Sequence, residues 1–482
     1  MLFNSLRFLL FFSVFFALYH GPAKTIRGGQ NWLLLLGSYA FYAFASWKIL
    51  PLLVLFTAIF YSLGLLIERA STTRAKSLWT AVGVAAGLGG LLYFKYTNFF
   101  IEMFVELISA LGFRAHAPTL SIIMPVGISF WTFRLLSYVI EIGRGRQRAT
   151  QDKVGFAAYV AFFPCVLSGP IDRPGQFLPQ LEKQRDFDYE MAVDGLRQTL
   201  WGLFKKVVVA DELAEAGRQL IANPAGYSSS GLFVGMFILI LQMYADFSGY
   251  TDMAIGISKL LGLRISKNFN YPLFAQNIAD YWRRWHISLT SWLTDYVFLP
   301  LNIRWRDREK VGMAGAIGVT FLLSGLWHGA NETFVLWGLY HGLLYVPLIA
   351  TGTMSKKRKL TAIALGLPAP SVVLRAIATM ALVSFGLIMF NSPTVNGALA
   401  YMGRMFSLTG WEHGLVGHLP KLGLLWAAAM LLAEWFARDR DHGLAGVVSL
   451  MSGRLRMALY VALTLSVVLA SGQDVGFVYF QF

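Results

Sequence analysis

The sequence is poor in charged residues, which cover much of the surface of soluble proteins. Only 14% of its 482 residues are charged, against about a quarter in soluble domains. Hydrophobic residues make up 56%, and the mean hydropathy is +0.55. No polar segment is long enough to form a separate soluble domain. We therefore expect an all-α polytopic membrane protein with a single membrane-embedded domain over residues 1–482, in which a motif-rich body (1–355) precedes a C-terminal transmembrane group (371–482).

Cysteine and acidic residues are also scarce. Cys165 is the only cysteine, which excludes an intrachain disulfide and a cysteine-based metal cluster, and we expect no metal site. Lys and Arg number 41 against 26 Asp and Glu, giving a net charge of +15. The basic residues lie in short loops between apolar runs, which fits the positive-inside rule and not nucleic-acid binding. If the loops 68–77, 141–153 and 356–359 are cytoplasmic, the N-terminus lies outside.

Apolar runs recur from one end of the chain to the other. Because roughly 20 apolar residues cross a bilayer and several runs are shorter, we expect about 11 to 13 transmembrane segments. The predicted spans are Leu2–Tyr19, Trp32–Trp47, Ile49–Ile67, Leu78–Tyr93, Ile122–Ile140, Val154–Leu167, Met191–Ala210, Leu232–Ala245, Val311–Leu326, Thr333–Ile349, Val372–Phe390, Leu422–Phe436 and Leu455–Ala470.

One histidine interrupts a stretch that otherwise reads as membrane-buried. His328 lies within Leu323–Trp337, and a titratable group at such depth usually serves a site or a pathway. If the segment is helical throughout, Asn331 and Glu332 share a face with His328 and could orient its imidazole. The alternative is a buried histidine that bonds to a neighbouring helix. His341, thirteen residues later, is expected to be structural.

A second histidine, His286, lies in the aromatic and basic stretch Asp280–Tyr296. Trp282, Trp285, Leu289, Leu293 and Tyr296 recur there at helical spacing and predict an apolar stripe. Arg283 and Arg284 point elsewhere, and interfacial anchoring explains these Trp and Arg residues equally well. An imidazole at the edge of a buried stripe needs a partner, so His286 is a candidate site residue.

Two other polar islands break the apolar pattern. Residues 163–174 hold several Pro and Gly residues that one unbroken helix cannot contain, so irregular backbone is expected there, within protein or beside a cavity. Asp172 and Arg173 could line the mouth of that cavity or pair at the surface. Asp246 follows an apolar run and is expected to cap the next helix.

Taken together, these islands resemble the membrane-bound O-acyltransferase family, in particular its bacterial alginate O-acetylation branch. The sequence departs from the branch at Asn302–Lys310, where a glycine-rich turn is usual, and at Trp131 and Arg134, where Phe and Gln are more frequent. The stretches that carry the resemblance are Met124–Phe130, Ser168–Ile171, Asp246–Gly256, Trp282–Leu289, Gly325–Asn331 and Phe477–Phe482.

The resemblance implies a helical fold around a central funnel or tunnel, with His328 as the catalytic histidine and His286 as the second characteristic one. It implies that an acetyl group passes from a cytoplasmic thioester, acetyl-coenzyme A, towards an extracytoplasmic polysaccharide such as alginate. Periplasmic acetyltransferase-type proteins and polysaccharide synthesis machinery are the implied partners, and the implied location is the bacterial inner membrane. We expect no permanently bound cofactor. Further residues expected to line the site are Asn331, Trp327, Arg283, Arg284 and Asp246.

Other functions remain open from the sequence. Within the family, the chain could transfer D-alanine or a fatty acyl group instead of acetate. Outside it, intramembrane histidines and broken helices also suit a transporter or flippase for cell-surface polymer precursors. A non-enzymatic scaffold for a polysaccharide synthase is the third alternative. Substitution of His328 separates these possibilities, because a scaffold keeps its function without that imidazole.

Overall fold

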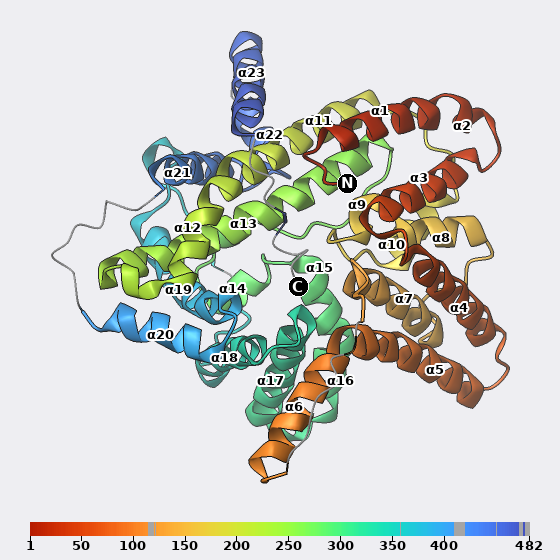
Figure 1. Ribbon diagram of the computed structural model, residues 1–482. Helices are drawn as coiled ribbons and strands as arrows, with labels where there is room; N and C mark the ends of the chain where they lie inside the picture. The colour runs from red at the N-terminus through yellow and green to blue at the C-terminus, as the bar shows by residue number, and fades with distance from the viewer. Residues whose placement is uncertain are drawn as a thin grey trace. The chain divides into compact units, whose positions relative to one another are not determined.

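The computed structural model describes residues 1–113, 120, 122–356, 358–408, 420–449, 451–471 and 476–477. Within these residues the chain is helical and contains no strand, only an isolated bridge between Ala362 and Pro368 (Figure 1). The prediction of an all-α polytopic membrane protein is confirmed. Most of the C-terminal motif Phe477–Phe482 and Lys357 of the basic loop lie outside the described residues.

The chain divides into two compact units. Unit 1 comprises Met1–Leu196 with Ala254–Ser266, and unit 2 comprises Arg197–Met253 with Lys267–Phe482. Residues of α11 (Tyr189–Leu203) and α13 (Ser229–Leu260) belong to both. The other helices of unit 1 are α1 (Leu6–His20), α2 (Pro22–Thr25), α3 (Gly29–Ser46), α4 (Leu50–Arg69), α5 (Thr73–Leu91), η1 (Leu92–Tyr96), α6 (Thr97–Ala110), α7 (Ile128–Gly143), α8 (Lys153–Ala161), α9 (Phe163–Val166) and α10 (Pro174–Leu181).

Unit 2 holds the remaining helices, among them two π-helical stretches, η2 and η5. In chain order they are η2 (Phe204–Ala210), α12 (Asp211–Ala222), η3 (Pro224–Gly226), η4 (Pro272–Phe274), α14 (Ile278–Trp282), α15 (Ile287–Leu293), η5 (Thr294–Phe298), α16 (Leu299–Arg304), η6 (Arg306–Arg308), α17 (Glu309–His328), α18 (Glu332–Ala350), η7 (Ala364–Gly366), α19 (Pro370–Asn391), α20 (Val395–Phe406), α21 (Lys421–Phe436), α22 (Gly443–Ser449) and α23 (Gly453–Ala470).

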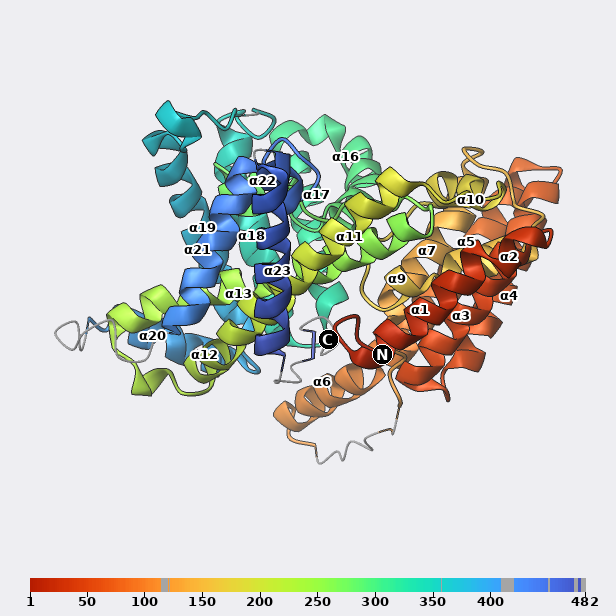
Figure 2. The same cartoon turned by 90° about the horizontal axis from the view of Figure 1, so that it is seen from above.

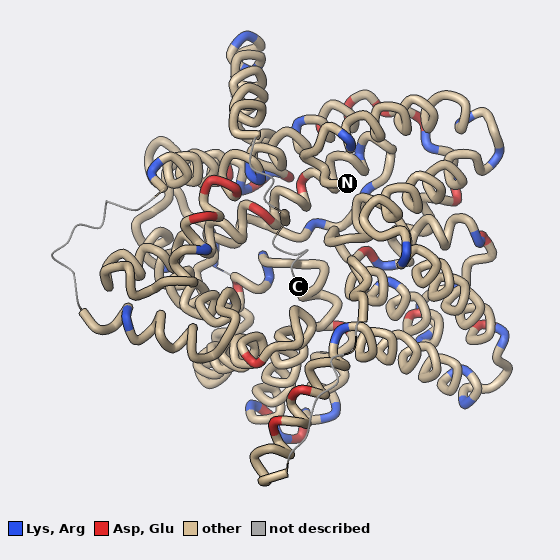
Figure 3. The backbone as a smooth tube through the Cα atoms, viewed as in Figure 1, with Lys and Arg blue, Asp and Glu red and all other residues tan. Residues whose placement is uncertain are grey.

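Eight helical segments within the described residues are long and apolar enough to cross a membrane. Several other predicted spans form shorter helices, such as α7 for Ile122–Ile140. Figure 3 shows long stretches of helix without a charged residue, with Lys and Arg gathered at turns such as that between α4 and α5. The eight segments are Leu6–Thr25, Leu50–Arg69, Thr73–Ala110, Ser229–Leu260, Arg306–His328, Glu332–Ala350, Pro370–Asn391 and Gly453–Ala470.

In unit 1 the backbone is irregular between α9 and α10, as the prolines predict. Asp172 in this stretch is buried and lies 4.0 Å from the guanidinium of Arg134 on α7. Its carboxylate also accepts a hydrogen bond from the backbone N–H of Ser266 at 2.7 Å. Arg134 in turn donates to the carbonyls of Tyr159 and Pro170. Asp172 is therefore a buried anchor of the irregular segment, and the alternative that it pairs with Arg173 at the surface is wrong.

In unit 2, α17 and α18 form a closely packed pair that lies side by side in both views (Figures 1 and 2). Glycines allow the approach: a Cβ at Gly325 would overlap the carbonyl oxygen of Phe334, and one at Gly338 that of Phe321. Small residues at such crossings let membrane helices pack closely. The close approach of α18 at Gly325 fixes the end of α17, where His328 lies.

A buried ionic network includes Asp246 and Asp252, the two acidic residues of α13. Asp246 lies within this 32-residue helix and pairs with Lys206 of η2, at 2.7 Å. Lys206 also pairs with Asp211 at 2.8 Å, while the neighbouring Lys205 pairs with Asp252 at 2.5 Å. The prediction that Asp246 caps a helix is wrong, because α13 continues through it to Leu260. A buried lysine needs a carboxylate partner, and Asp246 provides one.

Candidate active site

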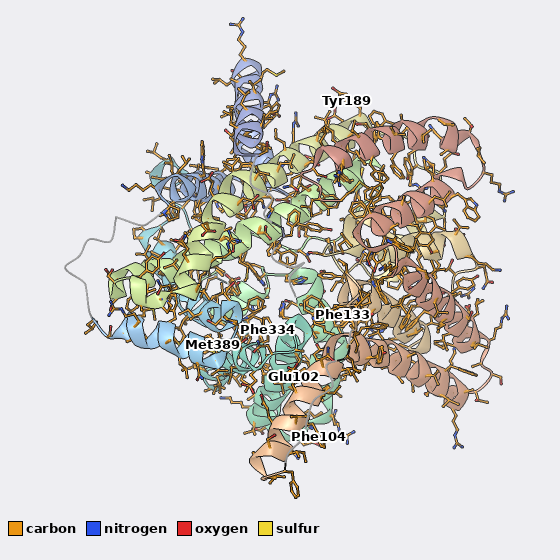
Figure 4. The ribbon with its side chains drawn as sticks, in the orientation of Figure 1. Glu102, Phe104, Phe133, Tyr189, Phe334 and Met389 are labelled. Carbon is orange, nitrogen blue, oxygen red and sulfur yellow. The ribbon has the colours of Figure 1, made fainter. Side chains whose placement is uncertain are left out.

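His328 is the last residue of α17 and is buried, with 4% of its surface exposed. Its imidazole lies among aromatic rings from the helices that follow. The ring centroids of Trp337 on α18 and Phe390 on α19 are 5.2 and 4.9 Å away. Phe334, labelled in Figure 4 together with Met389 of α19, belongs to the same hydrophobic core. The imidazole is therefore enclosed by apolar surfaces that exclude bulk water.

His286 is also buried, with 1% exposed, and lies in a break between two helices. Its φ of 43° and ψ of 52° lie in the left-handed region. This conformation is uncommon for residues other than glycine and often occurs at functional sites. The expected continuous stripe over Asp280–Tyr296 is wrong, because α14 ends at Trp282 and α15 begins only at Ile287. Burial lowers the pKa of His286 to about 3, so its imidazole is neutral at physiological pH.

Trp327 brings the two histidines into one neighbourhood. Its ring centroid lies 5.8 Å from that of His286 and 4.9 Å from that of His328. The ring of Phe247 on α13 also packs edge-on against His286, with the ring centroids 4.8 Å apart. The structure thus assembles His286, Trp327 and His328 from segments about forty residues apart in sequence, as a shared site requires.

A cavity of about 250 Å³ in unit 2 lies along α17, and His286, Trp327 and His328 are not among its lining residues. Ile317, Thr320, Phe321 and Ser324 of α17 line it, and their spacing of three and four residues marks one helix face. His328 continues that face one turn beyond Ser324. The other lining residues come from α14 and the residue after it, from α15, η5 and α18, and from the loop after α18: Ala279, Trp282, Arg283, Leu289, Thr290, Leu293, Thr294, Phe298, Tyr345, Met354 and Ser355.

Trp282 connects this cavity to His328 through a second indole. The ring centroids of Trp282 and Trp337 are 5.7 Å apart, and Trp337 contacts His328. Ser324 and Trp337 were not among the sequence candidates. A signal existed for Ser324, because it lies one helical turn before His328. Trp337 lies in the same stretch of sequence as His328, Leu323–Trp337. Only the packing of α18 against α17 shows that its ring contacts the imidazole of His328.

The two arginines of the aromatic stretch differ in position. Arg283 lines the cavity and donates to the carbonyl of Met354 at 3.2 Å, with Asp280 3.7 Å away. Arg284 bonds to Asp280 at 3.0 Å and to the carbonyl of Asn270, outside the cavity lining. Asp280 therefore fixes the turn that precedes His286. Of the two arginines, only Arg283 is available at the cavity to a substrate.

Asn331 and Asp246 hold structural positions near the site. Because α17 ends at His328, the expected helical face shared by His328, Asn331 and Glu332 does not form. Asn331 caps α18 by accepting from the Thr333 N–H at 3.0 Å, and its amide donates to the Pro393 carbonyl at 2.9 Å. Asp246 pairs with Lys206, as described above, although the next residue, Phe247, contacts His286.

Comparison with known proteins identifies the family. The model of the membrane-bound O-acyltransferase family matches residues 113–390. The chain is 36% identical over 417 residues to the probable alginate O-acetylase AlgI of Pseudomonas aeruginosa, covering 86% of this chain and 76% of that protein. It is 33% identical to the Azotobacter vinelandii protein of the same name over the full length of both. It is 31% identical over 414 residues to the peptidoglycan O-acetyltransferase of Helicobacter pylori, covering 80% of this chain and 76% of that protein.

These relatives are acyltransferases, so the transporter and scaffold readings are set aside. Similarity to them extends over most of the chain, and the family-model match over residues 113–390 spans the segments that hold His286 and His328. The chain belongs to the membrane-bound O-acyltransferase family and is a multi-pass membrane O-acyltransferase.

Proposed function

We propose that the protein transfers an acetyl group from a cytoplasmic thioester, acetyl-coenzyme A, for O-acetylation of an extracytoplasmic polysaccharide such as alginate. The observation that carries this proposal is the buried cluster of His286, Trp327 and His328, in which His328 lies one helical turn beyond Ser324 of the cavity wall. Acetyl transfer is the activity named for relatives that the chain matches over most of its length.

In this proposal His328 is the general base. Its neutral imidazole takes the proton of the acceptor hydroxyl as the oxygen attacks the thioester carbonyl. The tetrahedral oxyanion then collapses, the carbon–sulfur bond breaks, and the thiolate takes the proton back from His328. The products are an ester and free coenzyme A, and the imidazole is regenerated. Burial of His328 among Trp337 and Phe390 supports this role, because excluded water cannot hydrolyse the thioester.

His286 is assigned to positioning of the reacting carbonyl. A neutral imidazole carries one N–H donor, which suits stabilisation of a developing oxyanion without competition for the acceptor proton. Its low pKa supports this assignment, because the ring stays neutral throughout the physiological range. Arg283 at the cavity wall is assigned to a phosphate of the donor, since guanidinium groups bind phosphate well.

The acetyl group is proposed to reach the polysaccharide with the help of periplasmic acetyltransferase-type partners, at the bacterial inner membrane and close to the polysaccharide synthesis machinery. Transfer of D-alanine is the second candidate. It is favoured by 29% identity over 227 residues to the teichoic acid D-alanyltransferase of Bacillus subtilis. That match covers only 45% of this chain and 56% of that protein, so acetyl transfer is preferred.

Membrane vesicles that contain the protein test the proposal directly. They are supplied in turn with acetyl-coenzyme A or palmitoyl-coenzyme A, each labelled in the acyl group, and with an acceptor polysaccharide. Incorporation of acetyl label, without palmitoyl label, is expected. Incorporation of palmitoyl label in place of acetyl label would reject the acetyl assignment.

Cavity-filling variants test whether the donor binds beside α17. Ser324→Leu adds bulk to the cavity wall and should raise the KM for acetyl-coenzyme A by about tenfold or more, because the variant removes space that the donor needs. Leu323→Phe adds bulk on the exposed side of the same helix and serves as the control. An unchanged KM in both variants would place the donor elsewhere.

A further inference from the structure

Unit 1 contains a second, larger cavity that the acyl-transfer proposal does not use. Its volume is about 630 Å³, and it lies where four segments meet. These are α2 with the turn that follows it, the first residues of α3, the N-cap residue Asp152 of α8, and residues 181–185, from the last residue of α10 onward. Its lining is largely polar, in contrast to the aromatic surroundings of the histidines in unit 2.

A buried guanidinium forms part of the cavity wall. Arg185 is 6% exposed and donates from Nε to the Tyr19 hydroxyl at 2.6 Å and from Nη2 to the Asn31 side-chain oxygen at 2.7 Å. Nη1 donates to backbone carbonyls, the nearest that of Lys183 at 3.1 Å. All of these acceptors are neutral. Among the described residues, no carboxylate lies within 4.0 Å of Arg185.

The buried charge of Arg185 is therefore held in place but not compensated. A buried cation without an opposite charge is costly, and the energetic gain from an anion in the adjoining cavity is correspondingly large. Nη2 carries two hydrogens, and Asn31 is its single acceptor within the described part of the chain. One donor hydrogen thus remains for a ligand.

The other charges around the cavity also favour an anion. Arg27 and Lys183 are exposed cationic side chains in the lining, and Lys24 adds a third, paired with Asp186 at 2.6 Å. Of the two acidic residues in the lining, Asp152 already accepts from the N–H groups of Val154 and Gly155 at the start of α8. The cavity wall is thus predominantly positive.

The cavity lies beside the end of a candidate membrane span. The span Leu6–Thr25 ends at this cavity. Because α3 begins at Gly29, the positive end of its helix dipole adds to the positive potential inside the cavity. Ile26 and Trp32, next to the cavity in sequence, are 64% and 54% exposed. Exposed apolar and tryptophan side chains beside cationic ones are typical of the membrane interface, where lipid phosphates lie.

We infer that this cavity of unit 1, built on Arg185 with Arg27 and Lys183 at its rim, binds a phosphate group at the membrane interface, as carried by an anionic phospholipid headgroup or by free phosphate. The inference goes beyond the proposed acyl transfer, since none of these residues lines the cavity beside His328. The bound phosphate supplies the counter-charge that Arg185 lacks.

Native mass spectrometry of the full-length protein in detergent tests the inference. Short-chain phosphatidylglycerol, phosphatidylcholine and inorganic phosphate are the three probes. The double variant Arg27→Gln with Lys183→Gln removes two exposed rim charges, so it is expected to fold. Arg69→Gln with Arg74→Gln removes two exposed charges elsewhere in unit 1 and is the matched control.

Phosphatidylglycerol is expected to bind the wild type and the control equally, and to bind the rim variant about tenfold or more weakly. Phosphatidylcholine should bind more weakly than phosphatidylglycerol to the wild type. Competition by inorganic phosphate would identify free phosphate as a sufficient ligand, and its absence would identify the lipid. Equal binding of phosphatidylglycerol to the rim variant and the control, or no binding of either phosphate probe, would overturn the inference.

Discussion

The ammonium of Lys206 lies 2.7 Å from the carboxylate of Asp246, and both side chains are almost completely buried. Lys206 belongs to η2, and Asp246 lies forty residues later within α13. The ammonium also lies 4.5 Å from the ring centroid of Phe477, near the C-terminus. This ion pair therefore joins three segments of unit 2, including the helix whose Phe247 contacts His286.

Removal of one member of this pair should strongly destabilise the protein. Lys206→Met leaves the carboxylates of Asp246 and Asp211 buried without their cation, which typically costs about 3–5 kcal/mol. The midpoint of thermal unfolding in detergent is the measurement. Arg218→Ala, which breaks the exposed pair with Glu215, should change stability by about 0–1 kcal/mol. Equal midpoints for the two variants would contradict the importance of the buried network.

Asn331 should act through helix capping and not through His328. Asn331→Ser keeps an oxygen that can accept from the Thr333 N–H and should retain both stability and activity. Asn331→Ala removes the cap and should lower stability by about 1 kcal/mol, with the activity of the folded protein unchanged. Thermal unfolding together with acetyl transfer per folded protein distinguishes the outcomes. A serine variant that is stable but inactive would instead show that the amide takes part in the reaction.

The depressed pKa of His286 predicts a specific dependence of stability on pH. In the unfolded chain the imidazole takes up a proton near pH 6.5, whereas in the folded protein its pKa is about 3. Stability is therefore lost as pH falls from about 6.5 towards 3, by about 2 kcal/mol at pH 5. His286→Phe should show a smaller fall in unfolding temperature between pH 7 and pH 5 than the wild type. Parallel falls would show that His286 is not buried in its neutral form.

The sequence predicted the membrane class and the helical fold because composition and apolar runs are local properties. It also singled out His328 and His286, since an imidazole in an apolar stretch stands out against its neighbours. The predicted spans Val311–Leu326 and Thr333–Ile349 already placed a break next to His328, and α17 ends at His328 while α18 begins at Glu332. Asn331 before Glu332 is a recognisable signal for the start of the second helix. The left-handed conformation of His286 depends on how α14 and α15 pack and leaves no local pattern.

The role of Asp246 could not be predicted from its own surroundings in the sequence. A carboxylate after an apolar run is an ordinary helix cap, and its partner Lys206 lies forty residues earlier. Lys205 and Lys206 did carry a signal, because two lysines within the predicted span Met191–Ala210 require buried carboxylates. Only the packing of η2 against α13 shows which carboxylates they bind.

The most direct measurement of the central claim is the acetyl content of polysaccharide made with His328→Phe, compared with His341→Phe at matched membrane expression. His341→Phe is the matched control, because both imidazoles are buried and both contact Trp337, at 5.2 Å for His328 and 4.9 Å for His341 between ring centroids. Loss of a general base costs about 10²–10⁴-fold in rate. His328→Phe should therefore abolish acetylation, and His341→Phe should leave it near the wild-type level. Wild-type acetylation in the His328 variant would contradict the assignment of the base and the mechanism built on it.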